Sequence, residues 1–304
     1  MELNRIYNMD CLEGMKEIPD GSIDLVIIDP PYYKVVNEKW DYLWANESEY
    51  IQWSLRYLSE IFRVLRIGGS LYLFGYFRIL ALLVYHFKDI GFELRQQIVI
   101  TKGLRSVAGR ATKQYKLFPN VTESCLFMIK DNKPFVKEYL KTHQELKKLS
   151  AKEINTLLGV KSNGGGMWSI YTGDNVCKQF PTKEIWNKLS SILGFDLPYE
   201  SVAQTFNPIM GITDVWNDID FYTEDRNHPT QKPVKLIKRL IQASSNKGDT
   251  ILDPFMGSGT TAVASVLEQR KFIGFETNPE YCKVANKRLR DLTGPFYIYG
   301  NIGV

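Results

Sequence analysis

An aspartate, two prolines and a tyrosine stand side by side at Asp29, Pro30, Pro31 and Tyr32. They directly follow residues 24–28, an apolar run of the kind that forms a buried parallel strand, so they are predicted to lie at the carboxyl edge of a sheet. Two consecutive prolines fix the backbone and remove two N–H donors, which leaves a rigid surface of carbonyl acceptors. The segment therefore predicts a site that accepts N–H groups; a plain β-turn after a strand is the alternative.

The chemistry that these acceptors suit is methyl transfer to an exocyclic amine of a nucleobase. Such an amine is a poor nucleophile because its lone pair is delocalised into the ring. If the Asp29 carboxylate and the Pro30 carbonyl each accept one N–H, the nitrogen is held out of conjugation with its lone pair aimed at a methyl donor. Positioning and electrostatics would then supply most of the acceleration. Tyr32 would offer an aromatic face to an extruded base.

A glycine-rich turn at residues 253–261 is the second candidate site. Its glycines let the backbone pass close to a ligand, and the helix predicted after it presents unpaired N–H groups. The turn holds Gly257 and Gly259, but Ala262 stands at the third glycine position of a dinucleotide fingerprint. The turn indicates a nucleotide-like cofactor, with a tight strand–helix connection as the alternative.

Two acids accompany this turn. Glu276 ends a predicted strand at the spacing expected of an acid that binds ribose hydroxyls. Asp253 stands at the end of the strand before the turn, where it is placed to accept from an ammonium group. A nucleoside cofactor that carries a positive charge would suit both acids.

The elements that position these segments alternate between strand and helix. Strands are predicted at residues 5–8, 24–28, 70–74, 97–101, 125–129, 250–252 and 272–275. Helices are predicted at residues 48–65, 77–88, 233–244, 260–269 and 279–291. Ser48 is the expected N-cap of the first of these helices, and Gly68 and Gly69 are expected to close it. The alternation predicts one α/β sheet, assembled from both ends of the chain, with helices on both faces.

The pattern changes over residues 131–226. Lysine-rich helices are predicted at residues 135–149, 151–158 and 182–193, separated by loops that contain glycines and aromatic residues. This stretch is predicted to be a separate module, between a first α/β portion at 1–130 and a second at 227–304.

Composition and charge restrict the class of protein. The 304 residues are 44% hydrophobic, which fits a well-cored globular chain, and the formal net charge is +4. The four cysteines lie far apart without metal-ligand spacing, so we expect reduced thiols and no metal site. No run is long enough to span a membrane and the first residues lack an apolar signal segment, so a cytoplasmic location is expected.

A basic stretch at residues 95–116 contains no Asp or Glu after Arg95. Its small residues indicate a flexible loop, and unopposed cations in such a loop predict contact with nucleic-acid phosphates. An ordinary exposed loop is the alternative. The candidate DNA-binding residues are Lys102, Arg105, Arg110, Lys113 and Lys116.

These motifs together resemble the β group of amino-methylating DNA methyltransferases, found in restriction–modification systems and phages. In chain order the matching segments are NMDCLEGM (8–15), DPPY (29–32), HPTQKP (228–233), DPFMGSGTT (253–261) and GFETNPEYC (274–282). The resemblance covers both α/β portions, and the central module matches only loosely. In this group DPPY precedes the cofactor-binding segment, a circular permutation of the usual order.

The resemblance implies a Rossmann-like fold that binds S-adenosylmethionine, with a mostly parallel sheet of seven strands, one of them reversed. Residues 1–130 would be the catalytic half, 227–304 the cofactor-binding half and 131–226 an inserted, mainly helical target-recognition module. Double-stranded DNA is the implied substrate. A homodimer and a cognate restriction endonuclease are further candidate partners, and the group is prokaryotic or phage-encoded.

The resemblance also implies roles for individual residues. Asp10 and Cys11 resemble the edge that contacts the adenine of the cofactor, and Asp29 also borders the cofactor site. Lys232, with His228 and Thr230 nearby, resembles the segment beside the methionine carboxylate. The residues that resemble the cofactor loop and its ribose ligand are Asp253, Pro254, Phe255, Gly257, Ser258, Gly259, Thr260, Thr261 and Glu276.

The aspartate of DPPY favours N6 of adenine, because SPPY usually accompanies methylation of N4 of cytosine. Methylation of cytosine N4 is therefore the main alternative. An RNA or protein amide methyltransferase, for which NPPY is typical, and a catalytically silent DNA-binding protein are weaker alternatives. A nicotinamide oxidoreductase would leave DPPY without an explanation.

Residues 33–47 show no clear element and are predicted to be a mobile loop that orders over the flipped base. Trp40 or Trp44 could stack on that base, or both could be core anchors.

Overall fold

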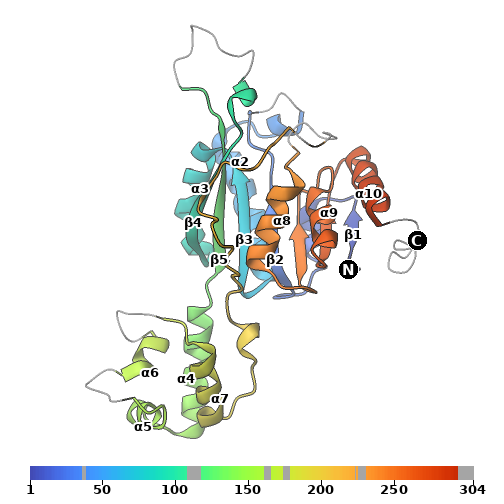
Figure 1. The fold of residues 1–304 in the computed structure, drawn as a ribbon. Coiled ribbons are helices and arrows are strands. Elements are labelled where there is room, and N and C mark those ends of the chain that lie inside the picture. The colour runs from blue at the N-terminus through green and yellow to red at the C-terminus, as the bar shows by residue number, and fades with distance from the viewer. Residues whose placement is uncertain are drawn as a thin grey trace. The chain divides into compact units, whose positions relative to one another are not determined.

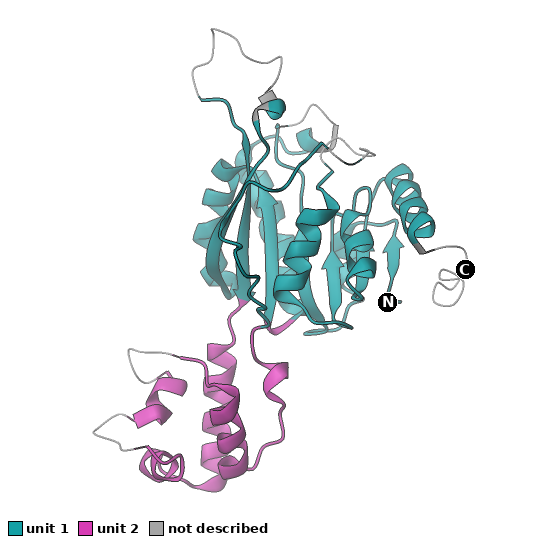
Figure 2. Cartoon of the chain, viewed as in Figure 1, with its two compact units in different colours: residues 1–65, 69–129, 205–304 teal, residues 66–68, 130–204 magenta. Residues whose placement is uncertain are grey.

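The computed structural model describes residues 1–35, 39–107, 118–160, 166–173, 179–222, 224 and 231–293. The chain forms two compact units, coloured separately in Figure 2. The first comprises residues 1–65, 69–129 and 205–304, and the second comprises residues 66–68 and 130–204. The helical module predicted at 131–226 extends further along the chain than the second unit. Trp216, Ile219 and Phe221 explain the difference, because they are buried in the core of the first unit.

The described strands of the first unit form one eight-stranded sheet in the order β1-β8-β7-β2-β3-β5-β4-β6 (Figure 1). Their bounds are β1 Arg5–Tyr7, β2 Ile23–Ile28, β3 Leu65–Gly75, β4 Phe92–Thr101, β5 Thr122–Lys130, β6 Val215–Trp216, β7 Thr250–Asp253 and β8 Lys271–Phe275. In sheet order, the neighbouring strands β1, β8, β7, β2 and β3 pair in parallel, and β5 runs antiparallel to β3.

The sheet has one strand more than the seven that the resemblance implies. The short strand β6 pairs in parallel with β4, and the buried Trp216 fixes it there by packing into the core. The α/β class and the contribution of both chain ends to one sheet are confirmed. The circular permutation stays a prediction.

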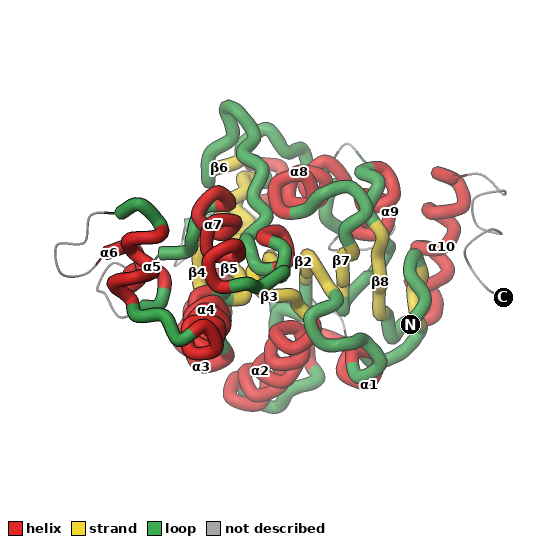
Figure 3. The backbone as a smooth tube through the Cα atoms, turned by 90° about the horizontal axis from the view of Figure 1, so that it is seen from below, coloured by secondary structure: helices red, strands yellow, loops and turns green. Residues whose placement is uncertain are grey.

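Helices cover both faces of this sheet, as Figure 3 shows. Helices α1 (Cys11–Met15), α2 (Glu47–Val64) and α3 (Phe77–Ile90) pack against one face, in a core that includes Val26, Ile28, Leu71 and Leu73. Helix α8 (Val234–Ser244) covers the other face, over the alternate residues Leu25, Ile27, Tyr72 and Phe74. Helices α9 (Thr260–Leu267) and α10 (Pro279–Thr293) pack together with β1 and β8. Alternating residues of the same strands therefore serve two separate cores.

Two details of α2 differ from the sequence-based expectation. The N-cap is Asn46 and not Ser48, because the Asn46 side chain accepts a hydrogen bond of 2.9 Å from the backbone N–H of Glu49. The helix ends at Val64, and Gly68 and Gly69 lie inside β3. The chain turns extended at Leu65 itself, whose ψ is 135°, so no glycine is needed to close the helix.

The second unit is helical. It contains α4 (Lys133–Lys147), α5 (Ala151–Leu157), α6 (Gly166–Tyr171), α7 (Lys183–Leu193) and the short 3-10 helix η3 (Tyr199–Ser201). Trp168, Trp186, Leu140 and Leu189 are buried at the centre of its core. Helix α5 begins with a capping box, in which Ser150 and Glu153 each accept from the other's backbone N–H. None of the described helices is long and apolar enough to cross a membrane.

Candidate active site

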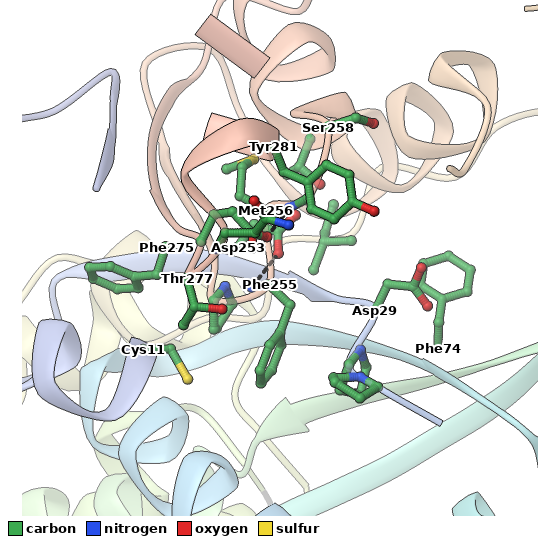
Figure 4. Close-up of a pocket in the computed structure, with 18 of the residues that line it drawn as sticks. Cys11, Asp29, Phe74, Asp253, Phe255, Met256, Ser258, Phe275, Thr277 and Tyr281 are labelled. Atoms are coloured by element: carbon green, nitrogen blue, oxygen red, sulfur yellow. Dashed lines mark hydrogen bonds between the residues drawn. The ribbon is translucent and has the colours of Figure 1, made fainter. Parts of the chain in front are cut away.

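Sheet order brings the predicted site residues together. Strands β8, β7 and β2 are neighbours and run in parallel, so their carboxyl ends lie at one edge of the sheet. Asp253 is the last residue of β7, and Asp29 and Glu276 directly follow β2 and β8, although these two are far apart in sequence. A cavity of about 490 Å³ opens at this edge (Figure 4). The predicted residues that line it are Asp10, Cys11, Asp29, Pro30, Pro31, Tyr32, Lys232, Asp253, Pro254, Phe255, Gly257, Ser258, Thr260, Thr261 and Glu276.

The carboxylate of Asp253 is the most deeply buried acid of the cavity, at 5% exposure. Burial raises its pKa to about 7, although the Thr261 side chain and a 3.0 Å hydrogen bond from the backbone N–H of Phe255 act in the opposite direction. The nearby charges of Asp29 and Glu276 contribute to the same rise of this pKa. A cation bound in the cavity would therefore be strongly favoured beside the ionised Asp253.

Glu276 is held by the backbone. One carboxylate oxygen accepts from the N–H of Gly257 and the other from the N–H of Asn278, each at 2.8 Å. Burial raises the pKa of Glu276, and these backbone donors partly offset it. Each oxygen keeps a second lone pair, so the fixed carboxylate can still accept hydrogen bonds from a ligand's hydroxyl groups.

The two glycines of the turn have different roles. Gly257 lines the cavity at φ +52°, where no backbone or side chain would crowd an added Cβ. Gly259 has φ +83°, and a Cβ there would lie 2.6 Å from the Cβ of Ala285 in α10. Among the predicted cofactor-loop residues Gly259 does not line the cavity. It permits the close approach of α10, where Arg288 donates to the Ser258 carbonyl at 2.8 Å.

Asp10 and Cys11 form the side of the cavity where α1 begins. Asp10 caps this helix, because its Oδ1 accepts from the N–H of Leu12 at 2.8 Å. Burial raises the pKa of Cys11 to about 12, so its thiol stays neutral and apolar. In Figure 4, Cys11 and Asp29 lie on opposite sides of the Phe255 side chain. Phe255 packs edge-on against Trp53 and Tyr57 of α2.

The DPPY segment is fixed by two residues that sequence reasoning did not single out. Tyr50 of α2 donates its hydroxyl to the Pro31 carbonyl at 2.6 Å. The fully buried Asp41 accepts from the backbone N–H groups of Tyr32 and Val35, both at 2.6 Å. These contacts set the backbone that carries Asp29.

Lysines neutralise the acids at this end of the cavity. Lys232, at 6% exposure, lies 2.6 Å from Oδ2 of Asp29 and 3.0 Å from the Tyr32 hydroxyl. Burial by itself lowers the pKa of Lys232, but the carboxylates of Asp29 and Glu123 outweigh burial and leave this pKa above its ordinary value. Lys232 was expected beside the cofactor's carboxylate, and the structure places it against Asp29. The surrounding structure keeps it a cation.

Glu123 of β5 is the functional candidate that sequence reasoning missed. Its Oε1 lies 2.7 Å from the Tyr32 hydroxyl, which is also within hydrogen-bond distance of Oδ1 of Asp29. Its Oε2 lies 3.1 Å from Nζ of Lys102. Glu123 follows Thr122 within a strand of mostly buried residues, so a charged residue in an apolar run was the available signal.

The described cations of the basic stretch differ in their surroundings. Lys102 is paired with Glu123 beside the cavity, whereas Arg105 is exposed in the 3-10 helix η2 (Leu104–Val107). Arg110, Lys113 and Lys116 lie outside the described residues, as do His228 and Thr230. Contact of this stretch with DNA stays a prediction.

The segment predicted to be a lid contains the 3-10 helix η1 (Lys39–Tyr42). Trp44 is buried and packs on Tyr50 and Trp53, as expected of a core anchor, and its side chain also borders the cavity. The Trp40 side chain lies outside the described part of the chain. Within the described residues, no group of three or more His, Cys, Asp or Glu could hold a metal ion.

Comparison with known proteins places this geometry in a family. The family model described as DNA methylase matches residues 23–287. The DNA adenine methyltransferase YhdJ of Escherichia coli is 29% identical over 95% of this chain and 83% of its own length. The type II methyltransferase M1.MboII of Moraxella bovis is 28% identical, over 96% of this chain and 98% of its own length.

A likeness to solved structures supports the fold. The structure described as an M1.HpyAVI–SAM complex aligns over 93% of this chain and 98% of its own, with a TM-score of 0.56 and 20% identity. The family match includes DPPY, the glycine turn and Glu276. This chain belongs to the DNA methylase family.

Proposed function

We propose that this protein transfers a methyl group from S-adenosylmethionine to N6 of a flipped-out adenine in duplex DNA. The observation that carries the proposal is one cavity with an N–H-accepting carboxylate, Asp29, at one end and two backbone-held acids, Asp253 and Glu276, at the other. Membership of the DNA methylase family supports DNA as the substrate. The name of the E. coli relative supports adenine as the base.

The residues of the cavity fit S-adenosylmethionine. This cofactor carries ribose hydroxyls, an ammonium group and a sulfonium, and the cavity presents two acids with no lysine or arginine paired to them among the described residues. Glu276 would accept from the ribose hydroxyls, and Asp253 would accept from the ammonium group. The apolar Cys11 and Phe255 would border the adenine ring. When bound, the cofactor supplies an electrophilic methyl group.

The catalytic residues act by positioning the nucleophile. Oδ2 of Asp29 is held by Lys232, so Oδ1 is the carboxylate oxygen that faces the Tyr32 hydroxyl and the amine site. Oδ1 and the Pro30 carbonyl would accept the two N–H bonds of the amine and turn its lone pair toward the methyl group. Tyr50 and Asp41 keep these acceptors in place. Tyr32 would present its ring to the base.

The further partners are proposals of the same kind. Sequence recognition would reside in the helical second unit and the basic stretch, and the homodimer, the cognate endonuclease and the cytoplasmic location stay predictions. A direct test of the proposed function is transfer of tritiated methyl groups to unmethylated DNA, followed by nucleoside analysis. We expect label in N6-methyladenine, which disappears in Asp29→Ala. Label in N4-methylcytosine would overturn the choice of base, and label only in RNA or protein would overturn the substrate class.

A further inference from the structure

The hydroxyl of Tyr32 has more acceptors around it than it has hydrogens. Oδ1 of Asp29 and Oε1 of Glu123 both lie within hydrogen-bond distance of this oxygen, and Lys232 donates to it at 3.0 Å. A phenol carries a single hydrogen, so it can donate to only one of the two carboxylates at a time. Asp29 and Glu123 therefore compete for one hydrogen.

The position of that hydrogen decides how much acceptor capacity Asp29 keeps for an amine. Oδ2 of Asp29 already accepts from Lys232 at 2.6 Å. If Oδ1 also accepts the Tyr32 hydrogen, each oxygen already has one donor before an amine arrives, and only a second lone pair is left for the amine N–H. If Tyr32 donates to Glu123 instead, Oδ1 is open to an N–H of the target amine. An alternative acceptor for Tyr32 thus makes Oδ1 of Asp29 a stronger acceptor for the amine N–H.

Glu123 is built to be that acceptor. It is 8% exposed, and its Oε2 is held by Lys102 at 3.1 Å, while Lys232 lies 3.6 Å from Oε1. Burial raises the pKa of Glu123, but the charges of Lys232 and Lys102 outweigh burial and leave this pKa below its ordinary value. The other titratable groups facing this cluster are Tyr32, Asp29 and the buried thiol of Cys125.

Stability alone gives little reason for this charge. Removing two charges from water costs about as much as their attraction returns, and apolar residues of similar volume often stabilise a core at least as well. The residues that follow Glu123 on β5, from Ser124 to Ile129, are themselves buried. The cluster is better explained by what Glu123 does for Tyr32 than by a contribution to folding.

We propose that Glu123 is a positioning residue that takes the Tyr32 hydroxyl hydrogen when the amine binds, and so leaves Oδ1 of Asp29 free to accept the amine N–H. No covalent bond changes in this step, because one hydrogen bond is exchanged for another. The proposal rests on the function proposed above and assigns Glu123, with Lys102 behind it, to the same site.

The first test is a double-mutant cycle between Glu123→Gln and Tyr32→Phe, read as the single-turnover rate of methyl transfer at saturating cofactor and DNA. The neutral amide accepts more weakly than a carboxylate, so we expect Glu123→Gln to slow transfer about tenfold. The dissociation constant of S-adenosylmethionine should change less than about twofold. In the Tyr32→Phe background the same substitution should have almost no effect, because the shared hydrogen is gone. Equal losses in both backgrounds would overturn the proposal.

The second test uses Lys102→Met and the pH dependence of the single-turnover rate. Without the Lys102 charge the pKa of Glu123 rises, and a protonated Glu123 cannot accept from Tyr32. The acidic limb of the profile should therefore move to higher pH in Lys102→Met. An unmoved limb would contradict the proposal. Lys88→Met removes an exposed cation from α3, outside the candidate DNA-binding residues, and is the matched control.

A third measurement does not depend on activity. Protein labelled with ¹³C at the tyrosine ζ carbon reports the hydrogen bond of each hydroxyl, and Tyr32→Phe identifies the Tyr32 signal. This signal should move in Glu123→Gln, and thermal denaturation shows whether the variant is folded. A folded Glu123→Gln protein with an unmoved Tyr32 signal would refute the coupling. A moved signal in a protein that methylates no DNA would uphold the coupling and refute the proposed function instead.

Discussion

The two ends of the cavity hold their acids in opposite ways. Asp253 and Glu276 accept from backbone N–H groups at 2.8–3.0 Å, and their pKa values are raised because burial is not balanced by cations. Asp29 and Glu123 are each paired with a lysine, at 2.6 and 3.1 Å. One end is therefore a region of uncompensated negative charge, and the other is close to neutral.

This difference in charge matches the ligands, because the charged end would bind the cofactor and the neutral end would bind the base amine. A cationic cofactor gains most where buried carboxylates lack partners, because its own charge completes the site. A neutral base amine offers no such charge, so the carboxylate that positions it is supplied with a lysine by the protein. The comparison predicts that substitutions at one end change cofactor affinity and that substitutions at the other change the rate.

The largest expected effect is on the rate at the neutral end. Asp29→Ala removes the acceptor for the amine N–H, and we expect the single-turnover rate to fall about 10³-fold, the size of effect seen when one oriented hydrogen-bonding group is lost. Cofactor affinity, followed by intrinsic tryptophan fluorescence, should change only a few-fold. A loss of affinity as large as the loss of rate would remove the distinction between the two ends.

The next effect is on affinity at the charged end. Glu276→Gln weakens the ribose contact and the hydrogen bonds to the N–H groups of Gly257 and Asn278. A hydrogen bond to a charged group contributes about 1.5–3 kcal/mol, so we expect the cofactor dissociation constant to rise about 10- to 100-fold. Isothermal titration calorimetry measures this constant, with Glu280→Gln at an exposed position of α10 as the control.

The pH dependence of cofactor binding sharpens the same comparison. The pKa of Asp253 is raised to about 7, so this carboxyl is largely neutral at pH 6 and ionised at pH 8. A cationic ligand prefers the ionised form, and affinity should therefore rise with pH between 5.5 and 7.5, by at most about tenfold per pH unit. Asp253→Asn should flatten this dependence. A wild-type affinity that is constant over this range would contradict the role given to Asp253.

The smallest effect is expected from the support of DPPY. Tyr50→Phe removes the 2.6 Å hydrogen bond to the Pro31 carbonyl but keeps the ring in place. We expect the methyl-transfer rate to fall about three- to tenfold and unfolding to become easier by about 1 kcal/mol. Single-turnover assays measure the methyl-transfer rate, and thermal denaturation measures the change in stability. Tyr85→Phe, at an 81% exposed position, is the control and should change neither.

Local patterns predicted the parts of the site that are continuous in sequence. DPPY after a buried strand, and a glycine turn followed by Glu276, could be placed at one sheet edge because parallel strands end together. The structure assembles these residues around one cavity. Their separate roles as catalytic and cofactor-binding residues stay predictions.

The parts that depend on pairing between distant segments were out of reach. Glu123 contacts Tyr32 only because β5 pairs with β3 in antiparallel, and β3 in turn lies next to β2, the strand that leads into DPPY. The pairing of Lys232 with Asp29 likewise needs the start of α8 to lie over β2. Asn46 replaced Ser48 as the cap because both residue types suit that role, and only the geometry of the chain decides between them.

The measurement that tests the account most directly compares Asp29→Ala with Asp253→Asn in one experiment. Cofactor dissociation constants and tritium transfer into N6-methyladenine would be measured on the same preparations, at saturating DNA. We predict that Asp29→Ala binds the cofactor and transfers label about 10³-fold more slowly than the wild type, whereas Asp253→Asn binds weakly and transfers label once the cofactor is saturating. If both variants lose binding and transfer together, or if saturating cofactor restores transfer to Asp29→Ala, the division of the cavity into a charged cofactor end and a neutral catalytic end is wrong.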